Sequence, residues 1–544
     1  MKTFQRLKDG KNKYLLIPVM PTPNGGLHLG HLSGPYLKMD VLARAQRRNG
    51  NETAIFFGSD VYESYMNLKS WQTGEEVEDI CNKFHQRMKN DLDALKIEYD
   101  GFMNPLDDAY KEDFKTFFRG VVKELISKGV VEVRDEKYLY AEHEDNFLTG
   151  CWINGTCPVC GAGTGSYQCE DCGTQYRPMD IINPSFRKGD SPLTPIEDKD
   201  LYLIINKKDE LLQHLERMNA GDEFIEIAKT YFDRQGKYVR ISNPGEWGIP
   251  FEIDDSKIPH VLFTYTALYF YSIFCGELYK KKFKLELNPF HKDSEVITVA
   301  SFGIDCTIPY MVAGIGLGIE SGTYRPMDFL LPNHFFTLEN SKFSTSRSHA
   351  IWGGDIVNKT PVSSDSIRYF LALKNPENEM RDFNVQEFID FVNKDLAKDL
   401  QLALTNVWNI MIAETVSNTD DEFLEKLESL LIAQLDYLTP PGFNLKNSCL
   451  SLKEWINYGS KNLDLNLAYW WLKGFALLAF PIMPDCATGI WHLLGHTDLP
   501  SEKDYFKQQQ MQFQKEFPQY FKAISFEELK AALPATLFAN EIKN

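Results

Sequence analysis

Two histidines in a glycine-rich stretch have a type and spacing suited to phosphate chemistry. His28 and His31 lie three residues apart within PTPNGGLHLGHLSG, residues 21–34. On the first turn of a helix this spacing places both imidazoles on one face. Imidazoles beside a phosphate can donate hydrogen bonds to the charge that develops as the phosphate is attacked. We therefore predict a phosphate-binding turn here, with a pair of surface histidines as the alternative.

Four cysteines form the clearest metal-binding pattern in the chain. Cys157 and Cys160 make one CxxC pair, and Cys169 and Cys172 make a second pair, with eight residues between the pairs. Two such pairs supply the tetrahedral thiolate set that suits structural Zn²⁺. The other cysteines are scattered, which is typical of a reducing compartment and argues against a disulfide framework.

An acidic residue and a polar loop complete the candidate chemistry. Asp60 follows an apolar run at residues 53–57 and could hold an amine, with a turn cap as the alternative. The loop ENSKFSTSRSHAI, residues 339–351, contains Lys342 and Arg347, which could neutralise a polyphosphate. A plain surface loop is the alternative.

These groups need a scaffold that gathers them, and the apolar pattern predicts a parallel α/β sheet. Residues 14–20 and 53–57 are predicted strands, joined by a helix over residues 32–48. Such units bind ligands at the carboxyl ends of their strands, where the histidines and Asp60 follow. A strand at residues 296–300 continues the sheet, so the sheet is split by an insertion.

The helix pattern and the composition shifts predict the domain organisation. Thr73, Gly74, Glu75 and Glu76 form a capping-box pattern that predicts a helix over residues 73–96. The predicted regions are the first half of a parallel α/β domain (1–110), an insertion with the cysteine knuckle at about 150–180 (111–250), the second half (251–335), a linker with the polar loop (336–385) and a helical domain (386–544).

Charge restricts the partners. The net charge of −18 argues against broad nucleic-acid binding. From residue 385 onward the chain has 13 Lys and 21 acidic residues but no Arg, the residue that combines phosphate clamping with base readout. The first ten residues are polar, and no apolar run reaches membrane-spanning length, so we expect a cytoplasmic protein with no membrane partner.

These features occur together in an order that resembles a known family. HLGH after the first strand, a split sheet, a four-cysteine knuckle, WGIP at residues 247–250, a KFSTSR loop and a helical end are similar to class I aminoacyl-tRNA synthetases, most of all the methionyl-tRNA synthetases. The resemblance implies a Rossmann-like parallel sheet split by a zinc-knuckle insertion and followed by an α-helical domain. It also implies attack of an amino-acid carboxylate on the α-phosphate of ATP, helped by Mg²⁺, and transfer of the acyl group to an acceptor.

The resemblance assigns roles to individual residues. Catalysis is assigned to His28, His31 and Lys342. ATP binding is assigned to Gly30, Gly303, Lys342, Ser344, Ser346 and Arg347. Amino-acid binding is assigned to Met20, Thr22, Asp60, Tyr265, Asp305 and Tyr310. Structural Zn²⁺ binding is assigned to Cys157, Cys160, Cys169 and Cys172.

Departures from the family pattern concern the phosphates and the amino acid. Thr345 stands where the family loop has a second lysine, a loss for which Arg347 could compensate. Thr22, Tyr265 and Tyr310 add hydroxyls where methionyl enzymes have other residues. A pocket built around hydroxyls rejects apolar ligands that leave them unpaired, so we expect an amino acid more polar than methionine.

The helical end departs furthest from the family. Lys398, Leu402 and Asn406 stand where methionyl enzymes read the anticodon with Asn, Asn and Arg. Together with the missing arginines, this argues against anticodon readout. The expected partners are an amino acid, ATP and an acceptor such as the acceptor end of a tRNA, and the acidic helical domain is a candidate docking surface for a partner protein.

Three hypotheses about function follow. The first is a paralogue that adenylates a different amino acid for a tRNA or another acceptor, as family members in natural-product biosynthesis do. The second is a divergent methionine–tRNA ligase of translation. The third is a non-catalytic, synthetase-like regulatory protein, against which the retained His28, His31, Asp60, Asp305 and Lys342 argue.

Overall fold

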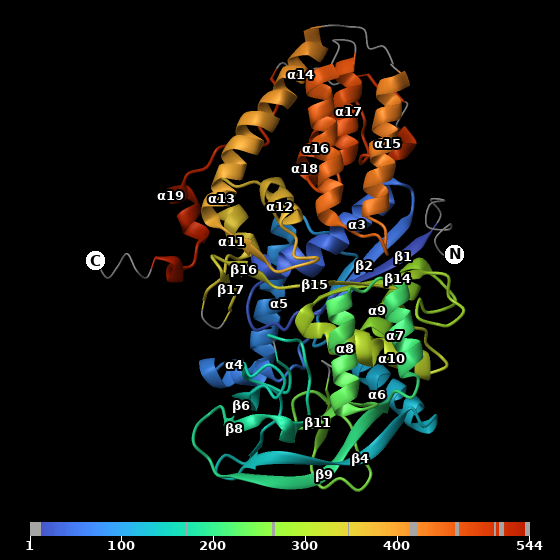
Figure 1. The fold of residues 1–544 in the computed structure, drawn as a ribbon, viewed down its shortest axis with the longest axis vertical. Helices are drawn as coiled ribbons and strands as arrows, with labels where there is room; N and C mark the ends of the chain where they lie inside the picture. Colours follow the sequence, from blue (N-terminus) through green and yellow to red (C-terminus); the bar gives the residue numbers. More distant parts are fainter. Residues whose placement is uncertain are drawn as a thin grey trace.

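Figure 1 shows the computed structural model, which describes residues 12–169, 171–263, 267–345, 348–413, 421–462, 467–504, 507–510 and 516–538. A parallel sheet with its helices lies in the middle of the molecule. The insertion extends from one end of this layer and carries the long antiparallel pair of β4 and β9. Helices of the last third of the chain cover the opposite end.

The central sheet confirms the predicted split α/β fold. Its strand order is β15 (Phe329–Asn333), β14 (Ile297–Gly303), β1 (Lys13–Pro18), β2 (Glu52–Gly58) and β3 (Gly101–Met103). Every neighbouring pair is parallel, and β1 pairs with strands from before and after the insertion. Helices cover both faces of such a sheet, which explains why the strands are nearly continuous apolar runs.

The helix after β1 lies where it was predicted. A helical run passes through α2 (Leu29–His31), a wider turn at Leu32–Tyr36 and α3 (Leu37–Arg48). Pro35 lies inside the wider turn, and because proline has no N–H it cannot make the ordinary α-helical bond. The run begins at Leu29, after the turn of residues 19–28 that follows β1, with His28 as its N-cap and His31 in its first turn.

The predicted capping box at Thr73 is wrong. Thr73 is the last residue of α4 (Tyr65–Thr73), and its hydroxyl donates to the carbonyl of Lys69. Gly74 follows with a φ of +71°, a left-handed conformation that glycine adopts without steric cost and that ends a helix. The next helix, α5 (Val77–Ala94), begins after Glu76, which makes no side-chain cap.

The insertion is built on antiparallel strands. A long pair, β4 (Val131–Ala141) and β9 (Leu193–Ile204), is flanked by β10 (Tyr238–Arg240) and β5 (Asn146–Phe147). The cysteine module has its own small sheet of β6 (Ile153–Thr156), β7 (Gly163–Thr164) and β8 (Ile182–Phe186). It also has its own buried cluster, which includes Leu148, Trp152 and Tyr167. The module is thus a separate small core.

The remaining elements complete the catalytic layer. Among the described residues, five helices and one wide turn join the insertion and the second half of the sheet. They are α6 (Lys111–Ser127), α7 (Lys208–Arg217), α8 (Asp222–Gln235), α9 (Leu268–Phe283), the wide turn Ile308–Gly314 and α10 (Ile315–Glu320). Short strands form two further sheets, one of β11 (Ser242–Pro244), β12 (Ile249–Pro250) and β13 (His260–Leu262), the other of β16 (Phe336–Leu338), β17 (Ser341–Lys342) and β18 (Arg381–Phe383). Helices α11 (Gly353–Asn358) and α12 (Ser364–Leu373) connect β17 to β18.

The last third of the chain is helical, as predicted. One continuous run passes through α13 (Val385–Asp390), the wide turn Phe391–Leu400 and α14 (Gln401–Ala413). The other helices are α15 (Asp421–Tyr437), α16 (Leu445–Asn462), α17 (Ala468–Ala479), α18 (Pro484–Leu493) and α19 (Phe526–Leu529). Within the described ranges, every helix is too short or too polar to cross a membrane.

Buried arginines join the helical region to the sheet layer. The Arg368 guanidinium is fully buried and donates to Asp40 Oδ2 on α3 at 2.6 Å and to the carbonyl of Ile482 at 2.9 Å. Arg48 donates to Gln434 Oε1 at 2.6 Å and to the carbonyl of Leu477 at 2.7 Å. Because a buried charge needs these partners, they fix how the helical region sits on α3.

Candidate active site and metal centre

A cavity of about 440 Å³ opens at the carboxyl ends of the central strands. That volume is typical of small-ligand sites. Its walls come from the turn after β1, the end of β2, the end of β14 and the loop after β17. The predicted site residues that line the cavity are Met20, Thr22, His28, Gly30, His31, Asp60, Gly303, Asp305, Lys342 and Ser344. Side chains far apart in sequence are therefore gathered where strand-end reasoning placed them.

The two imidazoles stack at the start of the helical run. Their ring centroids lie 3.7 Å apart with an interplanar angle of 15°. His28 caps the helix, because its Nδ1 accepts a hydrogen bond from the backbone N–H of His31 at 3.3 Å. A neutral His28 whose Nδ1 accepts carries its proton on Nε2. The ring of Phe343 stacks on the other side of His28 at 4.8 Å.

Both histidines are neutral near pH 7. Desolvation by burial lowers the pKa of His31 to about 4. Burial also lowers the pKa of His28 well below its ordinary value, and the neighbouring His31 lowers it further. Neutral imidazoles can still donate hydrogen bonds to a developing negative charge, since each keeps one N–H.

Gly30 fits the space between His28 and Phe343. A Cβ atom on Gly30 would lie 3.0 Å from His28 Nδ1 and 3.0 Å from Phe343 Cδ2. Such contacts are tighter than ordinary van der Waals contacts, so a larger residue would shift the imidazole or the Phe343 ring by a few tenths of an ångström. The sequence resemblance assigned Gly30 to the approach of adenine, and the structure adds this packing requirement.

The histidine turn is held from two other segments. Asp91 on α5 accepts the backbone N–H of Leu27 at 2.8 Å and that of Gly354 at 2.8 Å. The backbone N–H of Leu29 donates to the carbonyl of Ile351 at 2.9 Å. The turn after β1 is therefore bonded to the segment that directly follows the KFSTS loop, and the two candidate phosphate elements form one unit.

The loop after β17 closes over the same cavity. Lys342 lies on β17 with its Nζ 4.3 Å from the centre of the Phe335 ring. Ser344 pairs with His349 through two backbone hydrogen bonds of 2.9 and 3.0 Å. Thr345 lines the cavity, and a Cβ on Gly25 would lie 2.4 Å from its Cγ2, so the loop packs tightly on the glycine turn. The predicted site residues Ser346 and Arg347 lie outside the described residues.

Carboxylates and a thioether line the rest of the cavity. Asp60 is buried, and its backbone N–H donates to the carbonyl of Pro21 at 2.9 Å, which ties the ends of β2 and β1 together. Asp305 follows β14 in a short helical turn. Tyr310 lies behind Met20, with its hydroxyl 3.7 Å from the Met20 sulfur. Tyr265 lies outside the described residues.

Asn333, Phe343 and Glu63 are among the cavity residues that the sequence prediction missed. Asn333 ends β15, so strand-end reasoning could have found it. Phe343 follows Lys342 directly, but only a tertiary contact reveals that it stacks on His28. Glu63 comes three residues after Asp60 in a polar stretch and has no spacing signal.

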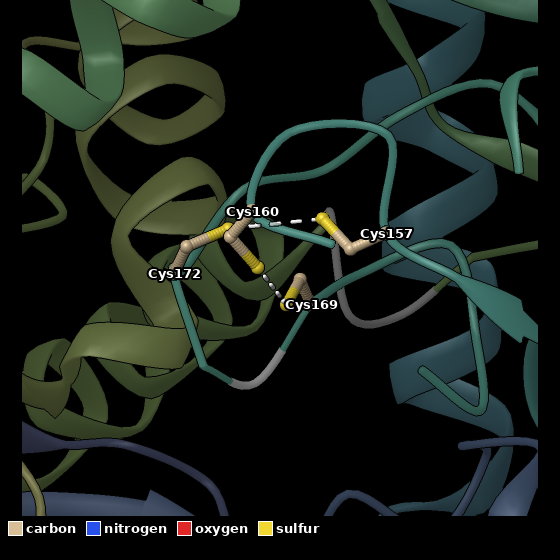
Figure 2. Close-up of side chains that lie close together, drawn as sticks. All are labelled: Cys157, Cys160, Cys169 and Cys172. Carbon is tan, nitrogen blue, oxygen red and sulfur yellow. Dashed lines mark hydrogen bonds between the residues drawn. The ribbon is translucent and has the colours of Figure 1, made fainter. Parts of the chain in front are cut away.

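The four predicted cysteines converge in the insertion (Figure 2). The sulfurs of Cys157 and Cys172 lie 3.9 Å apart, and those of Cys160 and Cys169 lie 3.5 Å apart. All four are free thiols. Zn–S bonds of about 2.3 Å in a tetrahedron place the sulfurs roughly 3.8 Å from one another. The cluster thus has the donor set and the spacing for one Zn²⁺ ion.

The split parallel sheet, the strand-end cavity with its paired imidazoles and the four-cysteine insertion together define the class I aminoacyl-tRNA synthetase architecture. A family model described as "tRNA synthetases class I (M)" matches residues 15–407, and the chain belongs to this family. Its fold and sequence are those of a methionyl-tRNA synthetase-like class I ligase.

Individual relatives agree with this assignment. The methionine–tRNA ligase of Chlamydia caviae is 27% identical over 534 residues, which cover 90% of this chain and 93% of the relative. That of Methanococcus aeolicus is 27% identical over 388 residues, which cover 71% of this chain and 56% of the relative. Among solved structures, Mycobacterium tuberculosis methionyl-tRNA synthetase bound by methionyl-adenylate matches with a TM-score of 0.69 at 16% identity, over 92% of this chain and 98% of that one.

Proposed function

We propose that this chain activates an amino acid by adenylation and passes the acyl group to an acceptor. The observation that carries the proposal is the single cavity into which the stacked imidazoles, Asp60, Asp305 and Lys342 converge from four separate segments. An amino-acid carboxylate would attack the α-phosphate of ATP, with Mg²⁺ on the phosphates, to give an aminoacyl adenylate and pyrophosphate. Family membership supports this ATP-dependent ligase chemistry.

The residues of the cavity would act by positioning and by charge stabilisation. His28 and His31 would donate from neutral rings to the oxygens of the α-phosphate as charge builds there. Lys342, with Ser344, Ser346 and Arg347 of the same loop, would hold the phosphates, and Gly30 and Gly303 would border the adenosine. Holding the carboxylate in line with the α-phosphate would supply the rest of the rate enhancement.

The amino acid would be more polar than methionine. Asp60 would hold the α-ammonium, and Met20, Thr22, Tyr265, Asp305 and Tyr310 would form the pocket. The Tyr310 hydroxyl contacts the Met20 sulfur, so a hydrogen-bonding phenol lies against the pocket wall. That contact already gives the buried phenol a partner, so the polarity of the pocket would rest on Thr22, which lines the cavity and would pair with a polar side chain of the substrate. The names of the sequence relatives favour the second candidate, a methionine–tRNA ligase.

The other regions have supporting roles in this proposal. The proposal keeps the domain division at residues 110, 250, 335 and 385 that the sequence predicts. The four cysteines would bind Zn²⁺ as a structural ion. The acceptor would be a tRNA end bound without anticodon readout, or another nucleophile of natural-product biosynthesis. The acidic, arginine-free helical domain would leave a surface for a partner protein.

Amino-acid-dependent ATP–pyrophosphate exchange tests the proposal. We expect exchange with one polar amino acid, little with methionine, and loss of exchange in the double variant His28→Ala/His31→Ala. Methionine-dependent exchange followed by charging of tRNA would establish the second candidate instead. Failure of every amino acid to support exchange would refute adenylation and support the regulatory alternative.

A further inference from the structure

Glu63 presents a buried carboxylate oxygen to the active-site cavity. It lies in the segment between β2 and α4, three residues after Asp60, and its side chain lines the cavity. The residue is only 7% exposed. Its Oε1 accepts the backbone N–H of Ser64 at 2.8 Å and the Ser64 hydroxyl at 2.7 Å. Its Oε2 is buried and has no hydrogen-bond partner among the described residues.

A carboxylate oxygen in this state requires a partner that the described residues do not supply. Burial without a partner costs free energy, and native proteins satisfy nearly all such groups. Burial also raises the pKa of Glu63. Among the described residues that line the cavity, Lys342 lies over the Phe335 ring, and the histidine pair is neutral. Asp60 and Asp305 also line the cavity, and the proposed α-ammonium lies at Asp60, so Glu63 Oε2 needs a different partner.

The position of Glu63 places the missing partner beside the cysteine module. The hydroxyl of Ser64 accepts the backbone N–H of Cys151 at 3.0 Å, and the Tyr65 hydroxyl donates to the carbonyl of Gly165 at 3.1 Å. Ser166 and Gln168 line the same part of the cavity wall. Glu63 therefore faces the cavity at the junction of α4 and the module.

We propose that Glu63 Oε2 is a second ammonium-binding position, which takes a protonated aliphatic amine in addition to the α-ammonium at Asp60. The proposal rests on the function proposed above. The amine belongs either to the side chain of the amino acid or to the acceptor. A charge-assisted bond to a buried carboxylate selects strongly against an isostere that lacks the amine, because the carboxylate is then left unpaired.

The test compares the wild type with Glu63→Gln, which keeps the shape and loses the charge. Asp198→Asn is the matched control, because Asp198 is a buried carboxylate, 8% exposed, that bonds Ser256 and Lys257 away from the cavity. One arm measures ATP–pyrophosphate exchange with lysine, ornithine and uncharged norleucine. The other measures transfer of the activated acyl group to 1,4-diaminobutane and to uncharged alcohols. Thermal melting confirms that each variant is folded, and Glu63→Asp tests rescue by a shorter carboxylate.

The two arms distinguish the source of the amine. We expect Glu63→Gln to raise the KM for the amine-bearing compound about 10- to 100-fold in one arm, with kcat nearly unchanged and the Asp198→Asn control like the wild type. Glu63→Gln within twofold of the wild type in both arms would overturn the proposal and indicate a protonated Glu63. If no amino acid supports exchange, the proposed function fails. Calorimetric titration with lysine and with 1,4-diaminobutane then tests the ammonium-binding position independently of catalysis. Binding to the wild type that is tenfold weaker in Glu63→Gln would support the position. No binding to the wild type would refute it.

Discussion

The neutrality of the histidine pair makes a quantitative prediction about pH. The pKa of His31 is about 4 in the folded chain, below the ordinary value of 6.5, because burial disfavours the imidazolium. The Nδ1 atom of His31 is buried with no hydrogen-bond partner in the described part of the chain, so the folded protein offers no bond that would stabilise a proton there. As pH falls, the unfolded chain therefore binds a proton on His31 before the folded chain does.

The sign and size of the effect follow from this difference. Stability contributed by His31 is present above about pH 6.5 and is lost as pH falls toward about pH 4. Between about pH 7 and about pH 5 the loss amounts to about 2 kcal/mol for this residue alone. Other buried histidines, such as His260, respond in the same direction, so a comparison with a variant is needed to isolate the contribution of His31.

His31→Asn supplies that comparison, because the amide keeps a donor but does not titrate. Urea unfolding followed by tryptophan fluorescence at both pH values should show the wild type losing about 2 kcal/mol more than the variant. Exchange activity of the wild type should stay level from about pH 8 to about pH 6, since the rings are already neutral. An equal pH dependence of stability in both proteins, or activity that rises as pH falls through 6.5, would refute neutral imidazole donors.

Three further perturbations test other parts of the structure. Elemental analysis should find one zinc per chain. Cys160→Ala should lose the zinc and expose the cysteine module to proteolysis. A folded wild type without zinc would contradict the metal site. Asp40→Asn removes the counter-charge of buried Arg44 and Arg368, so it should lower the free energy of unfolding measured in urea by about 3–5 kcal/mol. An unchanged urea midpoint would contradict this expectation. Thr345→Lys adds a cation at the cavity and should raise the exchange rate about tenfold over the uncharged Thr345→Met.

Strand-end reasoning predicted much of the fold and of the candidate site. The apolar runs gave β1 and β2 to within about two residues. The expectation that ligands bind at the carboxyl ends of parallel strands brought His28, His31 and Asp60 to one cavity before any contact was known. The paired CxxC spacing predicted the cysteine cluster, because each CxxC turn is local in sequence and brings its two thiols together.

The errors and omissions have a common physical origin in tertiary contacts and backbone conformation. The capping pattern at Thr73 failed because Gly74 adopts a left-handed conformation that ends the preceding helix. Phe343 and Glu63 belong to the cavity through contacts between segments, which no local spacing encodes. Arg368 and Asp40 are 328 residues apart, and only the packing of α12 against α3 makes them partners.

The central claim is that an amino-acid carboxylate oxygen attacks the α-phosphorus of ATP in this cavity. The most direct test uses the amino acid that gives the strongest exchange, with its carboxylate labelled with ¹⁸O, and analyses the nucleotide by mass spectrometry after the acyl group has been transferred. Cleavage at the carbonyl carbon leaves the bridging oxygen on phosphorus, so the account predicts a single ¹⁸O atom in AMP. Release of unlabelled AMP, or of ADP with ¹⁸O in orthophosphate, would contradict it.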